Sequence, residues 1–237
     1  MHLATLITNT DFSDFSRARP DDGEKFDAMI RSARPDWRTT PFWVCKDEFP
    51  SDINAFDGVM ITGSPASVND GAPWMAQLEV LVQEIIAARI PLFAACFGHQ
   101  MVAKALGRSI IRNPNGWAHG RISFERETRA PWSGEAPAVS LYGSHIEQVD
   151  RAPDGTTVLF STPACPVTGF ALGDTVFTIQ HHPEMTQEFI SDLVEEYADY
   201  VGPEVTETAR SSLSAPADGA EFSQEIARFF EHAARAA

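Results

Sequence analysis

The chain has 237 residues, of which 43% are hydrophobic, and its 33 acidic and 18 basic side chains give a formal net charge of −15. This length is sufficient for one α/β domain with a substantial core, or for one domain with a small appendage. The acidic balance disfavours nucleic acids and anionic membranes as partners, because binding to phosphate groups requires clustered Lys and Arg side chains.

The sequence carries no signal for membrane insertion or secretion. No apolar stretch approaches the roughly 20 residues that a spanning helix needs, and the first residues lack the basic region and the length of a signal peptide. The three cysteines, Cys45, Cys96 and Cys165, are far apart and do not suggest a disulfide framework. We therefore expect a protein of the reducing cytoplasm that does not bind membranes.

Strands alternate with helices in the first part of the chain, which is the order typical of a doubly wound sheet. The expected elements are strands over residues 3–8, 40–45 and 58–62 and helices over residues 23–33 and 73–89. In the second helix the apolar side chains recur with helical spacing, and Pro73 suits its first position. A turn, Gly63-Ser64-Pro65, follows the third strand, and its backbone N–H groups can face a substrate carbonyl.

Cys96 lies at the junction of a strand and a helix. It follows the apolar run Ile90-Pro91-Leu92-Phe93-Ala94-Ala95 and precedes a segment with a helical pattern, residues 97–106. Ala94 and Gly98 supply the small neighbours that a sharp turn needs, in an A-x-C-x-G variant of the nucleophile elbow. The free N–H groups and the positive dipole end of the helix favour a thiolate at this sulfur. The position therefore predicts a nucleophile.

The following part of the chain contains short alternating runs between residues 108 and 179, which predict further, partly antiparallel strands. The last run leads into Gln180-His181-His182-Pro183-Glu184. Because successive side chains on a strand alternate faces, His182 and Glu184 share one face and His181 points to the other. Glu184 can then hold the imidazole of His182, so the two are typical of a base and its orienting group for a distant nucleophile.

Helices are predicted in the rest of the chain. Residues 188–201 form one helical pattern, residues 203–215 contain a short helix, and a break at Ser214-Ala215-Pro216 precedes a final amphipathic helix rich in Phe. We interpret residues 1–201 as one domain and residues 202–237 as a helical C-terminal appendage. The apolar stripe of the last helix is expected to be core rather than an interface.

Four motifs, in the same order along the chain, resemble those of the class I glutamine amidotransferase family. They are Thr62-Gly63-Ser64-Pro65, Cys96-Phe97-Gly98-His99-Gln100, Gly143-Ser144-His145-Ile146-Glu147-Gln148-Val149 and Gln180-His181-His182-Pro183-Glu184. The resemblance covers most of the chain between Val59 and Glu184. It implies a flavodoxin-like α/β fold with a mostly parallel central sheet, flanked by helices and extended by additional antiparallel strands.

The resemblance also implies roles for individual residues. Cys96 would be the nucleophile, His182 the base and Glu184 the third member of a catalytic triad. The backbone N–H groups of Ser64 and Phe97 would form an oxyanion hole. The substrate-binding residues would be Gly63, Gln100, Ser144 and His145. Many members have two glycines before the proline of the first motif, and here the second is Ser64, which still supplies its N–H.

What the resemblance implies about function is cleavage of the γ-amide of glutamine, or of a related γ-glutamyl amide, through a cysteine thioester with release of ammonia. The segment Asn113-Pro114-Asn115-Gly116-Trp117 is similar to one in free-standing, GMP-synthase-like members. We expect no metal and no cofactor, because the sequence has no C-x-x-C or H-x-x-x-H pair and no G-x-x-x-x-G-K-[ST] phosphate loop. Transfer of the ammonia would require a separate synthase or acceptor protein.

Two other functions are open at this point. A stand-alone γ-glutamyl peptidase or hydrolase would use the same residues on a γ-glutamyl peptide and would need no ammonia channel. A catalytically silent binding module would keep the fold as an interaction surface, and the intact set of Cys96, His182 and Glu184 disfavours it.

Overall fold

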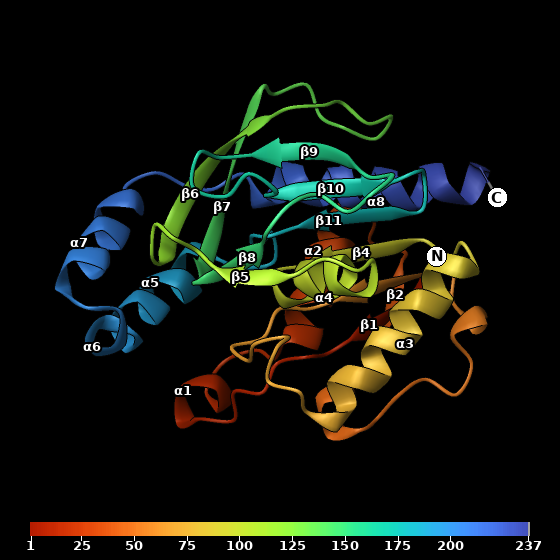
Figure 1. Cartoon of the computed structure of the whole chain (residues 1–237), viewed down its shortest axis with the longest axis horizontal. Coiled ribbons are helices and arrows are strands. Elements are labelled where there is room, and N and C mark those ends of the chain that lie inside the picture. Colours follow the sequence, from red (N-terminus) through yellow and green to blue (C-terminus); the bar gives the residue numbers. More distant parts are fainter. Residues whose placement is uncertain (237) are drawn as a thin grey trace.

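The computed structural model describes residues 1–236 and contains a nine-stranded mixed sheet (Figure 1). Its parallel half consists, in spatial order, of β2 (Arg38–Phe42), β1 (His2–Leu6), β3 (Gly58–Ile61), β4 (Leu92–Ala95) and β11 (Val176–Ile179). Antiparallel strands continue it as β10 (Gly169–Leu172), β9 (Thr157–Ser161), β6 (Ala118–Arg126) and β7 (Ala138–His145). A separate antiparallel pair joins β5 (Ile110–Arg112) to β8 (Glu147–Val149).

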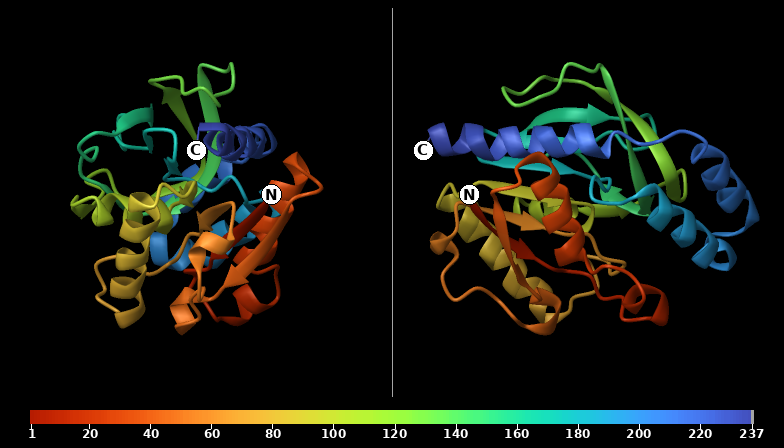
Figure 2. Two further views of the ribbon diagram at one scale, coloured as in Figure 1. Left: turned by 90° about the vertical axis from the view of Figure 1, so that its right-hand side faces the viewer. Right: turned by 180° about the vertical axis from the view of Figure 1, so that it is seen from behind.

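Helices cover both faces of the parallel half. On one face, α3 (Pro73–Ala87) and α4 (Phe97–Ala105) pack with Val59, Ile61 and Leu92 of the sheet. On the other, α2 (Asp22–Ala33) and α8 (Gly219–Ala236) pack with Met60 and Phe93, as the view from behind in Figure 2 shows. The alternation of buried side chains along β3 and β4 assigns successive residues to opposite layers. The predicted α/β fold, with a mostly parallel central sheet, flanking helices and additional antiparallel strands, is confirmed.

The last helix, α8, is part of the core. Phe222, Ile226 and Phe230 on its apolar face are buried in the same cluster as α2 and the sheet. Arg126 of β6 and Glu225 of α8 form a buried ion pair at 2.7 Å. The expectation that the apolar stripe is core is therefore confirmed, while the domain boundary after residue 201 stays a prediction.

The edge strand β2 differs from the expected strand over residues 40–45. It begins earlier, because Arg38 pairs with His2 of β1, and it ends at Phe42. The carbonyl of Trp43 then accepts the N–H groups of Lys46 and Glu48 in a tight turn, so residues 44–46 form the short helix η1 (Val44–Lys46) instead of extending the strand. The β-branched and aromatic side chains of this segment suit a strand, and the turn hydrogen bonds outweigh that preference.

The remaining helices lie in the connections. Before β3 there is a short turn of helix, η2 (Ile53–Ala55), and after β1 an unpredicted helix, α1 (Asp14–Arg17), which is capped by Ser13. The expected helix over residues 188–201 is divided into α5 (Gln187–Glu196), capped by Thr186, and α6 (Ala198–Val201), and α7 (Pro203–Ser212) follows. Within residues 1–236, none of the helices has the length and apolar character required to cross a membrane.

Candidate active site

The candidate site lies where three neighbouring parallel strands end. Gly63 closely follows β3, Cys96 follows β4 directly, and His182 lies just beyond β11. In open α/β sheets, ligands bind outside the carboxyl ends of the strands. All nine residues predicted for the site line one cavity of about 670 Å³. They are Gly63, Ser64, Cys96, Phe97, Gln100, Ser144, His145, His182 and Glu184.

Cys96 has a strained backbone, with φ 49° and ψ −106°, in the single residue between β4 and α4. A non-glycine residue at positive φ costs about 1–3 kcal/mol and persists only where the surrounding structure imposes it. The turn also depends on Gly98, because a Cβ atom there would lie 2.8 Å from the carbonyl oxygen of Ile61. The expected sharp strand-to-helix turn is present, and α4 begins directly after the cysteine.

His182 and Glu184 form a buried pair beside Cys96. Nδ1 of His182 lies 2.6 Å from Oε1 of Glu184, and the backbone N–H of His182 donates to the carbonyl of Tyr142 at 2.8 Å. A Cβ atom on Gly63 would lie 2.6 Å from Cε1 of His182 and 3.5 Å from Cβ of Cys96. Gly63 therefore marks the point at which the histidine ring and the cysteine converge, and a side chain at this position would displace the ring.

The charge state of His182 is set by these neighbours. Burial by itself lowers the pKa of an imidazole, but Glu184 and Cys96 both favour the protonated ring, and together they raise the pKa of His182 well above its ordinary value. An Nδ1–H donated to Glu184 leaves Nε2 to exchange a proton with a reacting group. The pair has the geometry of a base held by a carboxylate.

Gln180 is a site residue that the sequence reasoning missed. Its Nε2 lies 3.8 Å from Sγ of Cys96, and its Oε1 accepts a hydrogen bond from Nε2 of Gln100 at 3.2 Å. Gln100 also donates to the carbonyl of Glu147 at 2.9 Å. The strand alternation that pairs His182 with Glu184 places Gln180 on the same face, so the signal was present in the sequence.

The two predicted oxyanion donors are unengaged. Within residues 1–236, neither the N–H of Ser64 nor the N–H of Phe97 has a hydrogen-bond acceptor. Phe97 is the first residue of α4, where a helix leaves its N–H groups free. Its ring stacks on Trp74 with the centroids 5.6 Å apart, which anchors the start of the helix in the core.

Ser144 and His145 close one side of the cavity from the end of β7. The hydroxyl of Ser144 is buried and has no partner among residues 1–236. Nδ1 of His145 lies 3.0 Å from the carbonyl oxygen of Glu147, and burial lowers the pKa of His145 to about 4. Protonation of the His145 ring is therefore disfavoured at physiological pH.

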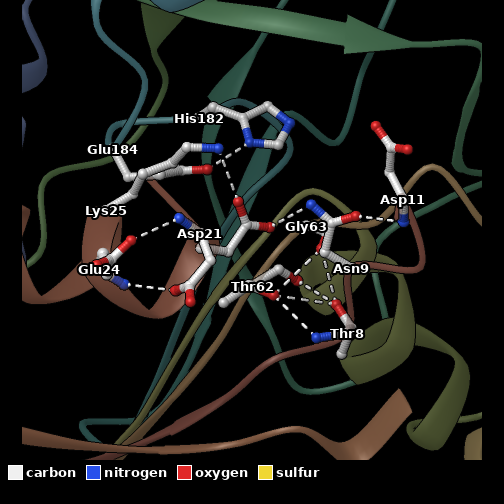
Figure 3. Close-up of polar contacts among 11 residues, drawn as sticks. Thr8, Asn9, Asp11, Asp21, Glu24, Lys25, Thr62, Gly63, His182 and Glu184 are labelled. Atoms are coloured by element: carbon white, nitrogen blue, oxygen red, sulfur yellow. Dashed lines mark hydrogen bonds and ion pairs between the residues drawn. The ribbon is translucent and has the colours of Figure 1, made fainter. Parts of the chain in front are cut away.

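The far wall of the cavity is aromatic and was not predicted. It is formed by Phe15, Trp117, Phe189, Tyr197 and Tyr200. Lys25 is the only Lys or Arg among the described residues that line the cavity. Its Nζ, drawn in Figure 3, lies 3.0 Å from Oδ1 of Asp22. The same atom lies 3.8 Å from the ring centroid of Phe189. These residues come from the segment after β1, from the loop between β5 and β6, and from residues 189–200, and no local pattern indicates that these parts of the chain lie close together.

The match to a known family agrees with this geometry. Residues 36–191, well over half of the chain, match the family described as Glutamine amidotransferase class-I. The chain belongs to the class I glutamine amidotransferase family. Cys96, His182 and Glu184 all lie within the matched part of this class I amidotransferase domain.

Several proteins of this family resemble the chain along much of its length. A glutamine amidotransferase-like protein of Schizosaccharomyces pombe is 27% identical over 205 residues, which cover 81% of the chain and 83% of that protein. Gamma-glutamyl peptidase 3 of Arabidopsis thaliana is 31% identical and matches 65% of the chain and 66% of the peptidase. The glutamine-hydrolysing GMP synthase of Halobacterium salinarum has a subunit that is 29% identical, over 57% of the chain and 70% of that subunit.

Solved structures of class I amidotransferases share the fold. The crystal structure of a glutamine amidotransferase from Thermotoga maritima superposes with a TM-score of 0.73 at 20% identity, over 97% of the chain and 96% of that structure. A glutamine amidotransferase from Methylobacillus flagellatus gives a TM-score of 0.74 at 18% identity, over 99% of the chain and 94% of that structure. The likeness extends through the C-terminal helices as well as the sheet.

Proposed function

We propose that this chain hydrolyses the γ-amide bond of glutamine or of a related γ-glutamyl amide through a thioester on Cys96. The observation that carries the proposal is the convergence of the Cys96 side chain and the His182–Glu184 pair at one end of an open cavity, beside two unengaged backbone N–H groups. Cysteine, histidine and carboxylate in this order form the triad of nucleophilic catalysis.

In the first half of the reaction, Sγ of Cys96 attacks the γ-carbonyl carbon while His182 carries the thiol proton on Nε2. The negative charge that develops on the carbonyl oxygen is stabilised by the N–H groups of Ser64 and Phe97. When the carbon–nitrogen bond breaks, His182 returns its proton to the leaving nitrogen. A γ-glutamyl thioester remains on Cys96, and ammonia or an amine leaves.

In the second half, His182 takes a proton from a water molecule, and the resulting hydroxide adds to the thioester carbonyl. The same N–H groups hold the second oxyanion. The carbon–sulfur bond then breaks, the sulfur recovers the proton from His182, and glutamate is released. Glu184 keeps the imidazole in one tautomer and stabilises its protonated form in both halves.

Two observations bear on the leaving group. A cavity of about 670 Å³ lies within the range of sites for ligands of drug size, so it offers room beyond a γ-glutamyl group. Lys25 supplies a positive charge in that space, suited to a carboxylate on the leaving amine. These features favour a γ-glutamyl peptide as a second candidate substrate beside glutamine, and a relative of the chain is named a gamma-glutamyl peptidase. If glutamine is the substrate, use of the ammonia would require a separate synthase partner in the cytoplasm.

The test is a substrate panel combined with trapping of the intermediate. Wild type and Cys96→Ala would be incubated with glutamine, γ-glutamylglycine and α-glutamylglycine, followed by acid quenching and mass spectrometry of the Cys96 peptide. We expect turnover of the γ-linked compounds only, and a glutamyl adduct on Cys96 in wild type. A folded wild type that cleaves none of a broad γ-glutamyl panel and forms no adduct would support the silent binding module instead.

A further inference from the structure

Thr8, two residues after the end of β1, lies against the turn that follows β3. Thr8 and Thr62 are both fully buried. The backbone N–H of Thr8 donates to the hydroxyl of Thr62 at 3.0 Å, and the Thr8 hydroxyl lies 2.9 Å from the carbonyl oxygen of Gly63 (Figure 3). The Thr62 hydroxyl lies 3.1 Å from the same oxygen. Two side-chain hydroxyls, from the segments that follow β1 and β3, therefore meet at the Gly63 carbonyl.

The available protons determine which bonds form. Each hydroxyl has one proton to donate. The Thr62 carbonyl, which is 3.0 Å from the Thr8 hydroxyl, already accepts the N–H of Gly98 at 3.2 Å. The Gly63 carbonyl has only the hydroxyls of Thr8 and Thr62 as donors within residues 1–236. Of the three acceptors near the Thr8 hydroxyl, the Gly63 carbonyl is the nearest, at 2.9 Å, against 3.0 Å for the Thr62 carbonyl and 3.2 Å for the Thr62 hydroxyl, so we assign the Thr8 proton to Gly63.

The orientation of this carbonyl determines the direction of the Ser64 N–H. The chain has no cis peptide bond within residues 1–236, and in a trans peptide the N–H points opposite to the preceding C=O. With its carbonyl directed at the two threonines, the Gly63–Ser64 peptide directs the Ser64 N–H away from them, toward the cavity that Gly63, Ser64 and Cys96 line. Rotation of this peptide by half a turn would replace a donor in the cavity with a carbonyl oxygen.

We propose that Thr8 is a positioning residue that, together with Thr62, locks the Gly63–Ser64 peptide with its N–H facing the reacting carbonyl. The inference rests on the proposed function and adds a positioning residue to it.

The chain offers a matched control for the test. Thr5 lies on β1, three residues before Thr8, and is equally buried, but its hydroxyl has no partner within residues 1–236. Thr5→Val and Thr8→Val therefore remove the same group from similar surroundings, and only the second removes a hydrogen bond to the turn. Thr8→Ser restores the hydroxyl without the methyl group.

The kinetic test compares these three variants with wild type on the γ-glutamyl compound that wild type cleaves. For Thr8→Val we expect kcat to fall about 10- to 100-fold, approaching the effect of losing one oxyanion donor, with little change in KM. Thr5→Val and Thr8→Ser should stay close to wild type. Alkylation of Cys96 by iodoacetamide forms no oxyanion, so its rate should be unchanged in Thr8→Val. Equal kcat values for Thr8→Val and Thr5→Val would overturn the proposal.

A crystal structure of Thr8→Val tests the lock without relying on activity. We expect the Gly63–Ser64 peptide to be rotated or to occupy two orientations, and to occupy one orientation in Thr5→Val and wild type. A single unrotated peptide in Thr8→Val would overturn the inference even if wild type cleaved no γ-glutamyl compound, an outcome that would refute only the proposed function. If Thr8→Val did not fold, Thr8→Ala would take its place in both experiments.

Discussion

Nδ1 of His182 lies 2.6 Å from Oε1 of Glu184, and the second carboxylate oxygen, Oε2, is buried without a partner among residues 1–236. The histidine is thus the only hydrogen-bond partner that the described residues give this carboxylate. The pairing stabilises an imidazolium that would otherwise be costly in a buried site.

Replacing Glu184 by Gln should impair turnover without abolishing it. The substitution keeps the volume and removes the charge that holds the His182 proton, but Cys96 is intrinsically more acidic than a serine nucleophile and depends less on its base. We expect kcat/KM to fall about 10²- to 10³-fold, against roughly 10⁵-fold or more for Cys96→Ala. The measurement is kcat/KM for the two variants, with melting curves as the control for folding. Equal losses would show that the carboxylate is as necessary as the nucleophile.

The strained backbone of Cys96 predicts an unusual order of stability among its variants. Cys96→Ala keeps a Cβ atom at φ 49° and should keep the strain, whereas Cys96→Gly should release about 1–3 kcal/mol of it. Both variants should lack activity. Although glycine ordinarily costs about 0.5–1 kcal/mol relative to alanine, we expect Cys96→Gly to unfold at the same urea concentration as Cys96→Ala or at a higher one. A clearly lower midpoint for the glycine variant would argue against stored strain at this turn.

Buried neutral histidines should make the protein sensitive to acid. Burial lowers the pKa of His99 to about 3, lowers the pKa values of His119 and His145 to about 4, and is the main cause that places the pKa of His181 well below its usual value. In the unfolded chain these rings titrate near pH 6.5, at about the usual value for histidine. The unfolded state therefore binds more protons from about pH 6.5 down to about pH 3. The contribution of these histidines to stability is complete above this window and is lost as the pH falls through it.

The contribution of His182 to stability has the opposite pH dependence. Its pKa is raised in the folded chain, so its contribution is complete below about pH 6.5 and is lost as the pH rises through the raised value.

The acid sensitivity is measured by urea unfolding at pH 7.5 and pH 5, with His119→Phe as the comparison. Phe can keep the stacking of this ring on Tyr197 and does not titrate. We expect a smaller loss of stability in the variant, by up to about 1.4 kcal/mol per pH unit. Identical losses would exclude His119 as a contributor.

Lys25 should distinguish substrates by their leaving groups. Its ammonium has three N–H donors, and Asp22 engages one of them, so the others can bind a carboxylate in the cavity. We expect Lys25→Met to raise KM for γ-glutamylglycine roughly tenfold, as the loss of one charge-assisted hydrogen bond would. The rise should be much smaller for γ-glutamylmethylamide, which has no such carboxylate. An equal rise for both compounds would indicate that Lys25 acts on the shape of the cavity rather than on charge.

Local patterns predicted the turn at Cys96 and the pairing of His182 with Glu184, and the family resemblance added the other predicted residues of the site. The strand alternation that groups His182 with Glu184, and the small residues that flank Cys96, reflect backbone geometry, which acts over a few residues. The structure brings the nine predicted residues to one cavity, while their catalytic roles stay predictions. The same alternation rule covers Gln180, which the sequence reasoning left out.

Other parts of the site depend on contacts that no local pattern encodes. Lys25 lines the cavity from α2, which packs against the sheet. Thr8 contacts the Gly63 turn because β1 pairs with β3. The aromatic wall joins side chains from α1, from the loop before β6 and from residues 189–200. The helix α1 itself consists of only four residues. The position of β2 was predicted wrongly because its end is set by turn hydrogen bonds and by pairing with β1, and not by the preferences of its side chains.

The pairing of β4 with β11 also affects how activity arises during folding. Gln180 and Cys96, which meet beside this pair of strands, are 84 residues apart in the chain. Contacts of such long range form slowly, because the closing of the intervening loop costs entropy before the contact can repay it. A partly folded chain that lacks this strand pair would hold Cys96 without His182 beside it. The proposed reaction therefore requires the complete centre of the sheet, so recovered activity during refolding would report on the assembled sheet.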